Sequence, residues 1–166
     1  MAFESLTDDK IADLLNCPKH LVNPQVKSKI KDGHEQVNYR AKALDNSDHE
    51  FEIYKRQNLR EGMEDDFSCG ISWISPNGET LTLKRYNGPS HDHPNHLEKQ
   101  RLGYTYHIHI ATEKYIKANR KAEGFAFVTD KYNTIEGALH CLITDCKISG
   151  ISTTPDNTSQ TKLFTE

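Results

Sequence analysis

The chain has 166 residues, of which 35% are hydrophobic and 27% are charged, and its formal net charge is −3. This length favours one domain with a single core, which we place at residues 1–150. No apolar run approaches the roughly 20 residues that a membrane-spanning helix needs, and the first ten residues lack the basic and apolar regions of a secretion signal. The four cysteines form no Cys-x-x-Cys pair and are expected to be buried thiols, so we expect a cytoplasmic protein without a membrane partner.

The amino-terminal region predicts two helices. Thr7 precedes two acidic residues, which suit the first turn of a helix, and an apolar stripe follows at Ile11, Leu14 and Leu15. A second, short helix is expected over residues 25–31, ended by Gly33.

From residue 35 the apolar residues alternate with polar ones, which predicts two β-hairpins. The first joins residues 35–44 and 49–57 through turn-forming residues. The second joins residues 67–75 and 79–87 through Pro76, Asn77 and Gly78, and an Asn-Gly pair is typical of tight hairpin turns. The loop that follows, residues 88–103, is longer than most connections in compact domains, and such loops are often functional.

The last third of the chain predicts a strand over 104–111, a short helix that ends near residue 124, a strand over 125–129 and a closing helix over 134–146. Asn133 is the expected cap of this helix, with Glu136 three residues later. Residues 151–166 are rich in Ser and Thr, and we expect a disordered tail there. The whole pattern predicts an α+β fold: an antiparallel sheet of about five strands, with the N- and C-terminal helices packed on one face.

Strand alternation also sorts the side chains by face. The apolar face is expected to carry Phe51, Ile53, Phe67, Cys69, Ile71, Trp73, Leu81, Leu83, Tyr104, Tyr106, Ile108 and Ile110. The opposite face is expected to carry Tyr54, Arg56, Ser68, Gly70, Ser72, Thr82, Lys84, Tyr86, Thr105, His107 and His109. The small residues of the middle strand would leave a trough on this second face, suited to an extended polyanion. The other interpretation is the ordinary solvated face of an antiparallel sheet.

Five of the nine histidines lie between residues 81 and 113. His91, His93 and His96 fall in the long loop, and His107 and His109 fall on the strand after it, so we expect the two groups to converge. Residues 84–123 contain eight Lys/Arg and four Asp/Glu, although the whole chain is acidic. This local excess of positive charge indicates an anionic partner bound at one place.

The first chemistry that these residues suggest is metal-independent cleavage of RNA. A histidine can take the proton of a ribose 2′-hydroxyl while cations stabilise the charge on the phosphate. We assign the acid/base roles to His107 and His109, and phosphate binding to Arg56, Lys84 and Arg85. Tyr86 could stack on a base or donate a proton.

Two alternatives stay open. The histidines could hold Zn²⁺ in a hydrolase, with His91, His93, His96, His107 and His109 as the ligands. The same face could instead belong to an interaction module that binds a partner without turnover. A phosphoesterase with two His-x-Thr/Ser motifs is excluded, because His109 and Ala111 stand at the second position after His107 and His109.

The segments FSCG, LKRYNGPSH, HIHIATEKY and FVTDKY resemble an uncharacterised family of small bacterial proteins, over residues 49–148. That family implies no activity. A looser similarity links residues 84–87, Pro89, His91 and the His107/His109 pair to small toxins of bacterial toxin–antitoxin systems, although the acid of the toxin motif is missing and a long insertion separates its halves. With the histidine chemistry, this similarity implies an RNA-binding endoribonuclease with a cognate antitoxin as its protein partner.

Overall fold

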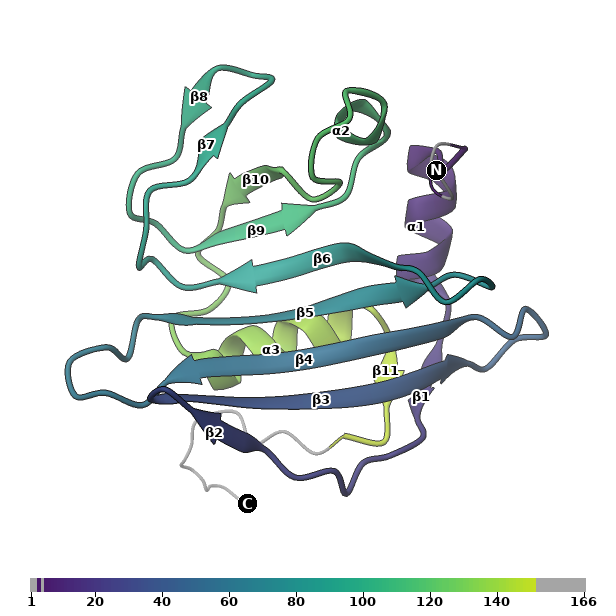
Figure 1. The fold of residues 1–166 in the computed structure, drawn as a ribbon, viewed down its shortest axis with the longest axis horizontal. Coiled ribbons are helices and arrows are strands. Elements are labelled where there is room, and N and C mark those ends of the chain that lie inside the picture. Colours follow the sequence, from purple (N-terminus) through teal and green to yellow (C-terminus); the bar gives the residue numbers. More distant parts are fainter. Residues whose placement is uncertain (1–2, 4, 152–166) are drawn as a thin grey trace.

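A large β-sheet forms the centre of the protein (Figure 1). The computed structural model describes residue 3 and residues 5–151. Within them the helices are α1 (Asp8–Asn16), α2 (Glu113–Lys117) and α3 (Ile135–Asp145). The strands are β1 (Lys19–Leu21), β2 (Lys29–Lys31), β3 (His34–Ala43), β4 (Glu50–Asn58), β5 (Phe67–Ile74), β6 (Thr80–Asn87), β7 (Pro94–Asn95), β8 (Gln100–Arg101), β9 (His107–Ile110), β10 (Phe125–Val128) and β11 (Ile148–Ser149). The predicted α+β class is confirmed.

The sheet has nine strands where about five were expected. Their order is β10-β9-β6-β5-β4-β3-β1-β11, with β2 also paired to β3, and β7 and β8 form a separate two-stranded ladder. All neighbours are antiparallel except β1 and β11, which are parallel. Both predicted hairpins, β3–β4 and β5–β6, are present.

The helix expected over residues 25–31 is wrong, because Lys29–Lys31 forms β2. The chain turns back into β3 through Asp32 and Gly33, whose φ angles are 52° and 76°. Two successive residues of positive φ make the tight turn that matches the twist of a two-stranded hairpin, and Asp-Gly is among its preferred sequences. The lysines of this segment therefore lie on the sheet.

Helices α1 and α3 pack on one face of the sheet, and Figure 1 shows α3 behind the long central strands. Each begins with a threonine cap. Thr7 Oγ1 accepts the amide hydrogen of Lys10, as predicted, whereas Thr134, and not Asn133, caps α3 by accepting that of Gly137. The core between helices and sheet includes Ile11, Leu14, Leu15, Phe51, Ile53, Cys69, Ile71, Ile135, Ala138, Leu139 and Leu142.

A β-bulge moves two of the proposed site residues to the other face. The pairing of β5 and β6 shifts between Ile71 and Ser72, which leaves one residue of β6 without its own partner. An extra residue reverses the alternation of every side chain after it. Lys84 and Tyr86 therefore turn toward the helices, where the Tyr86 hydroxyl donates a 2.6 Å hydrogen bond to Asp145 Oδ2 of α3. The expectation that they share a face with the histidines is wrong.

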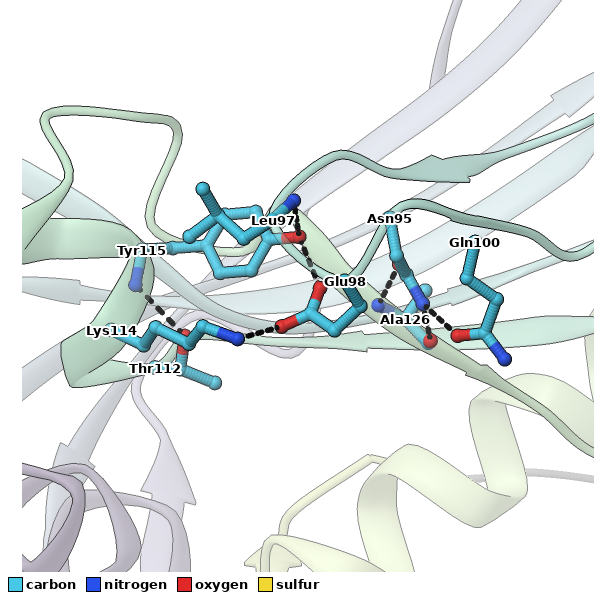
Figure 2. Close-up of polar contacts among 8 residues, drawn as sticks. All are labelled: Asn95, Leu97, Glu98, Gln100, Thr112, Lys114, Tyr115 and Ala126. Carbon is cyan, nitrogen blue, oxygen red and sulfur yellow. Dashed lines mark hydrogen bonds and ion pairs between the residues drawn. The ribbon is translucent and has the colours of Figure 1, made fainter.

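The long segment between β6 and β9 is a folded cover. Its β7–β8 hairpin is fastened to β10 by Asn95, whose amide donates to the Ala126 carbonyl at 2.8 Å and accepts from the Ala126 N–H at 2.9 Å (Figure 2). Beside it, Glu98 accepts hydrogen bonds from the Tyr115 hydroxyl and the Lys114 ammonium at 2.6 and 2.7 Å. The rings of His91 and His93, just before β7, lie against the buried histidines of β9.

Several boundaries differ from those predicted. Strand β9 begins at His107, and Tyr104, which alternation placed on the apolar face, is 72% exposed. Helix α2 ends at Lys117, well before residue 124. Cys69 and Cys146 are buried thiols as predicted, whereas Cys17 and Cys141 are only half-buried. The described helices include none that is long and apolar enough to cross a membrane. Of the predicted disordered tail, residues 152–166 lie outside the described residues.

Candidate active site

Four histidine rings from the loop and from β9 converge, as the sequence suggested. The His107 and His109 ring centroids are 5.0 Å apart, and the His93 ring lies 4.5 Å from His109 and 5.6 Å from His107. The His91 ring lies 5.6 Å from that of His107. His96, the fifth histidine of the prediction, is exposed and takes part in none of these ring contacts. We call His91, His93, His107 and His109 the histidine pocket.

Backbone carbonyls orient three of these rings. Nδ1 of His107 lies 2.8 Å from the Thr105 carbonyl oxygen, and Nδ1 of His109 lies 2.9 Å from that of Glu123. Nε2 of His93 lies 2.8 Å from the Gly124 carbonyl oxygen. A carbonyl can only accept, so each of these ring nitrogens carries hydrogen, and in a neutral ring the other nitrogen then carries a lone pair.

Four polar atoms beside the pocket are buried without a hydrogen-bond partner in the described residues: Nε2 of His107, Nε2 of His109, Nε of Arg85 and Oδ1 of Asn87. They share one face of two neighbouring strands, because Arg85 pairs with His109 and Asn87 pairs with His107. Each such atom costs about 1–3 kcal/mol of folding free energy. Concentrated in one place, unsatisfied donors and acceptors indicate a site for a ligand.

Burial sets the charge of the pocket. It lowers the pKa of His93, His107 and His109 from the usual value, and the Arg85 charge lowers the pKa of His109 further, to about 2. All three rings are therefore neutral near pH 7, and each presents a lone pair. The guanidinium of Arg85 is itself balanced by Glu123, at 3.6 Å, whose side chain is nearly buried.

The remaining predicted site residues are divided between the two faces. Arg85 lies beside the histidines, and Arg56 lies on the same face two strands away. Lys84 forms an ion pair with Asp145 at 3.6 Å on the helix side, and burial there raises the pKa of Tyr86 far above its usual value. Neither Lys84 nor Tyr86 can act on a group held by the histidines.

Two pockets lie on this face of the sheet between His91, at the rim of the histidine pocket, and β2. One pocket, of about 280 Å³, is lined by His34, Arg56, Asp66, Phe67, Ser68, Asn87 and His91. The next, of about 610 Å³, is lined by Val26, Lys27, Lys29, Lys31, Asp32, His34, Gln36, Asn38 and Arg56. The two share His34 and Arg56. We call them together the basic groove.

Strand register explains why the groove meets the histidines. One residue from each of β9, β6, β5, β4, β3 and β2 pairs with the next, and all of them face the same side. The row is His107, Asn87, Ser68, Arg56, Gln36 and Lys29. Gly70 keeps the middle of this face low, because a Cβ there would lie 2.9 Å from the Tyr54 ring and 2.7 Å from a backbone oxygen.

Sequence reasoning missed Lys27, Lys29 and Lys31 as groove residues because the segment was assigned to a helix. The signal that would have found them is Asp32-Gly33, which directly follows Ile30 and Lys31 and predicts a hairpin. Glu123, which balances Arg85, carried no such signal, since its role depends on a contact with a distant strand.

Among the described residues, no three His, Cys, Asp or Glu side chains already form a group that could hold a metal ion. Comparison with models of known protein families gives no match for the chain, and neither do comparisons with curated proteins and with solved structures. The resemblance to the bacterial family and to the small toxins therefore stays a prediction.

Proposed function

We propose that this protein binds RNA along the basic groove and cleaves the bound strand at the histidine pocket. The observation that carries the proposal is the cross-strand row that joins exposed Lys29 and Arg56 to buried His107. Strands lie about 4.8 Å apart, so the row is roughly 24 Å long, a length that suits several nucleotides of an extended strand. Its cations suit phosphates, which dominate the affinity of nucleic-acid binding.

The groove favours a single strand over a duplex. His107 and His109 are buried with the His93 ring against both, which would hold a double helix away from them, whereas one chain could enter past exposed His91. The ring of Tyr54, lying against Gly70, offers an aromatic surface on the same face, beside the Arg56–Ser68 pair of the row. Basic side chains combined with aromatic surfaces are typical of single-strand binding.

For the chemistry, a neutral imidazole of the pocket can accept the proton of a 2′-hydroxyl, and Arg85 can stabilise the charge that develops on the phosphate. Burial lowers the pKa of both His107 and His109, which favours them as proton acceptors more than as the donor to the leaving group. Exposed His91, at the mouth, is the remaining candidate for that role. In this metal-independent version, cleavage proceeds fully in EDTA.

The groove is tested with a fluorescent single-stranded RNA and anisotropy measured at several salt concentrations. The variant Lys29→Glu/Lys31→Glu should bind at least about tenfold more weakly, and its salt slope should be smaller by about 1.4, because two phosphate contacts are lost. The control Lys10→Glu/Lys131→Glu makes the same charge change at exposed lysines outside the groove. Equal losses in the two variants would point to net charge alone and contradict the groove.

Cleavage of the same RNA is then followed on a gel. The variant His107→Asn/His109→Asn keeps a donor for the Thr105 and Glu123 carbonyls, since an asparagine amide nitrogen stands close to the place of Nδ1, but it removes both Nε2 atoms. We expect RNA binding to persist and cleavage to be lost. Binding without cleavage by the wild type would favour the interaction module, and unchanged cleavage by the variant would rule out the pocket. A cognate antitoxin remains a prediction of the toxin resemblance.

A further inference from the structure

The histidine pocket has a feature that RNA binding does not explain: two imidazole lone pairs are buried side by side with nothing to bind. His107 and His109 are 0% and 2% exposed, and Nε2 of each lacks a partner in the described part of the chain. The Nδ1–H groups are held by the Thr105 and Glu123 carbonyls, so neither ring can turn over to satisfy Nε2 without losing that bond.

This arrangement is the one that metal-binding histidines adopt. A histidine that ligates a metal ion nearly always donates its other ring N–H to a backbone carbonyl or carboxylate, which fixes the tautomer and aims the lone pair. His93 follows the same pattern from the loop, because its Nε2 is held by the Gly124 carbonyl and Nδ1 is left with the lone pair.

The ring separations agree with a shared ion. Imidazoles bound to one zinc ion at about 2.0–2.1 Å have ring centroids roughly 5 Å apart. The three separations among His93, His107 and His109 are 4.5, 5.0 and 5.6 Å. His107 and His109 sit on one strand and are fixed, whereas His93 lies on the cover, where a small turn of its ring can complete the set.

We infer that His93, His107 and His109 bind a divalent transition metal ion of the zinc class, with His91 at the rim as a fourth imidazole. An all-imidazole set suits zinc, copper, nickel or iron and not magnesium or calcium. The charge of nearby Arg85 does not forbid a cation, because Glu123 balances it at 3.6 Å. Of the two unpartnered atoms nearby, Arg85 Nε–H could donate to an anionic oxygen carried by the ion, and Asn87 Oδ1 could accept a hydrogen bond from a water on it.

The inference shares its pocket with the proposed function, and so rests on it for any catalytic meaning, but metal binding itself requires no RNA. When bound, a zinc ion supplies a hydroxide at neutral pH, because it lowers the pKa of a coordinated water to about 7. The residues then act as ligands, and Arg85 stays in place to meet the phosphate.

The test uses the full chain, stripped with EDTA and titrated with Zn²⁺ by calorimetry and with Co²⁺ by visible absorption. We expect one equivalent to bind, with the d–d bands of nitrogen-ligated cobalt and a rise in Tm. Loss of an outer-shell partner already weakens metal binding 10–100-fold, so His109→Asn and His93→Ala should each weaken it by more than about 100-fold. The matched control His96→Asn changes an exposed histidine of the same loop and should bind as the wild type does.

Circular dichroism and urea unfolding establish that each variant folds. If His109→Asn does not fold, His93→Ala, whose substitution lies on the cover, still tests the metal site. Absence of uptake at micromolar Zn²⁺ would overturn the inference. So would binding that survives in both variants, since it would then come from surface histidines. If the protein takes up zinc but neither binds nor cleaves RNA, the metal site stands and the proposed function fails. If metal-free protein cleaves RNA in EDTA and takes up no zinc, the proposed function stands and the metal site fails.

Discussion

Lys19 is a fully buried lysine that ties two helices together. Its ammonium donates to the carbonyls of Leu15 and Cys17, at the end of α1, at 2.9 and 2.7 Å, and to that of Cys146, at the end of α3, at 2.9 Å. These carbonyls lack helical partners, and a cation suits the negative end of a helix dipole. One side chain thus satisfies the ends of both helices.

We therefore expect Lys19→Met to lower the free energy of unfolding by roughly 3 kcal/mol, because it leaves buried carbonyl groups without a donor. The measurement is urea unfolding at pH 7. Lys10→Met, at an exposed position on α1, is the control and should change stability by less than about 0.5 kcal/mol. Equal midpoints for wild type and Lys19→Met would mean that the carbonyls find other donors and that the lysine contributes little.

Sequence reasoning at the level of elements succeeded where local chemistry decides the structure. The Thr7 cap, the Asn77-Gly78 hairpin and the alternation of β4 and β5 all follow from nearby residues, and all are present. The bulge in β6 could not be predicted this way, since an extra residue between two strands depends on pairing with a partner strand. Because of this one extra residue, Arg85, and not Lys84, lies beside the histidines.

The convergence of the histidines was predictable from two clusters close in sequence, but their burial was not. Alternation placed His107 and His109 on an open face, and it cannot tell whether a loop folds over that face. The cover is held by single side chains from the loop. The single side chain of Asn95 makes two hydrogen bonds to the backbone of Ala126, and such a contact leaves no periodic signal in the sequence.

The cover can be loosened through Asn95, which is completely buried and bonded to both backbone groups of Ala126. Asn95→Ala leaves an N–H and a carbonyl of β10 unsatisfied, so we expect about 2–3 kcal/mol lower stability. Hydrogen exchange should become faster at residues 91–103 and at Ala126, while the amides of β4 and β5 exchange as before. Gln100→Ala, which removes one exposed partner of Asn95, is the control. Unchanged exchange across residues 91–103 would show that other contacts hold the hairpin.

At the scale of the whole molecule, the protein keeps a net charge of −3 while collecting lysines and Arg56 along one groove. Its lining holds Lys27, Lys29, Lys31 and Arg56 against the acids Asp32 and Asp66, so the excess of positive charge is local to the groove. This distribution is the reason to test binding with a charge-matched control pair. Net charge alone predicts equal losses of RNA affinity in the two variants, whereas local charge predicts a larger loss in the groove variant.

The free energy of unfolding should also fall at acidic pH, because of the buried histidines. Their pKa values in the folded state lie below the 6.5 of an unfolded chain, so below that pH the unfolded chain takes up protons that the folded protein does not. Protonation thus favours unfolding, and the stability that is fully present above pH 6.5 is lost as the pH falls. For His109, whose pKa is about 2, the loss is about 1.4 kcal/mol per pH unit, or roughly 2 kcal/mol by pH 5.

Urea unfolding in EDTA between pH 7 and pH 5 measures this effect. Carboxylates with lowered pKa values, such as Asp66 and Glu98, lose their contribution only below about pH 4.5, outside that window. Between pH 7 and pH 5, His109→Asn should therefore lose roughly 2 kcal/mol less of its unfolding free energy than the wild type does. His96→Asn, at an exposed position, should keep the wild-type slope. If the wild type is equally stable at pH 7 and pH 5, the rings take up protons in the folded state, which means that the cover opens readily and the lone pairs are not enclosed.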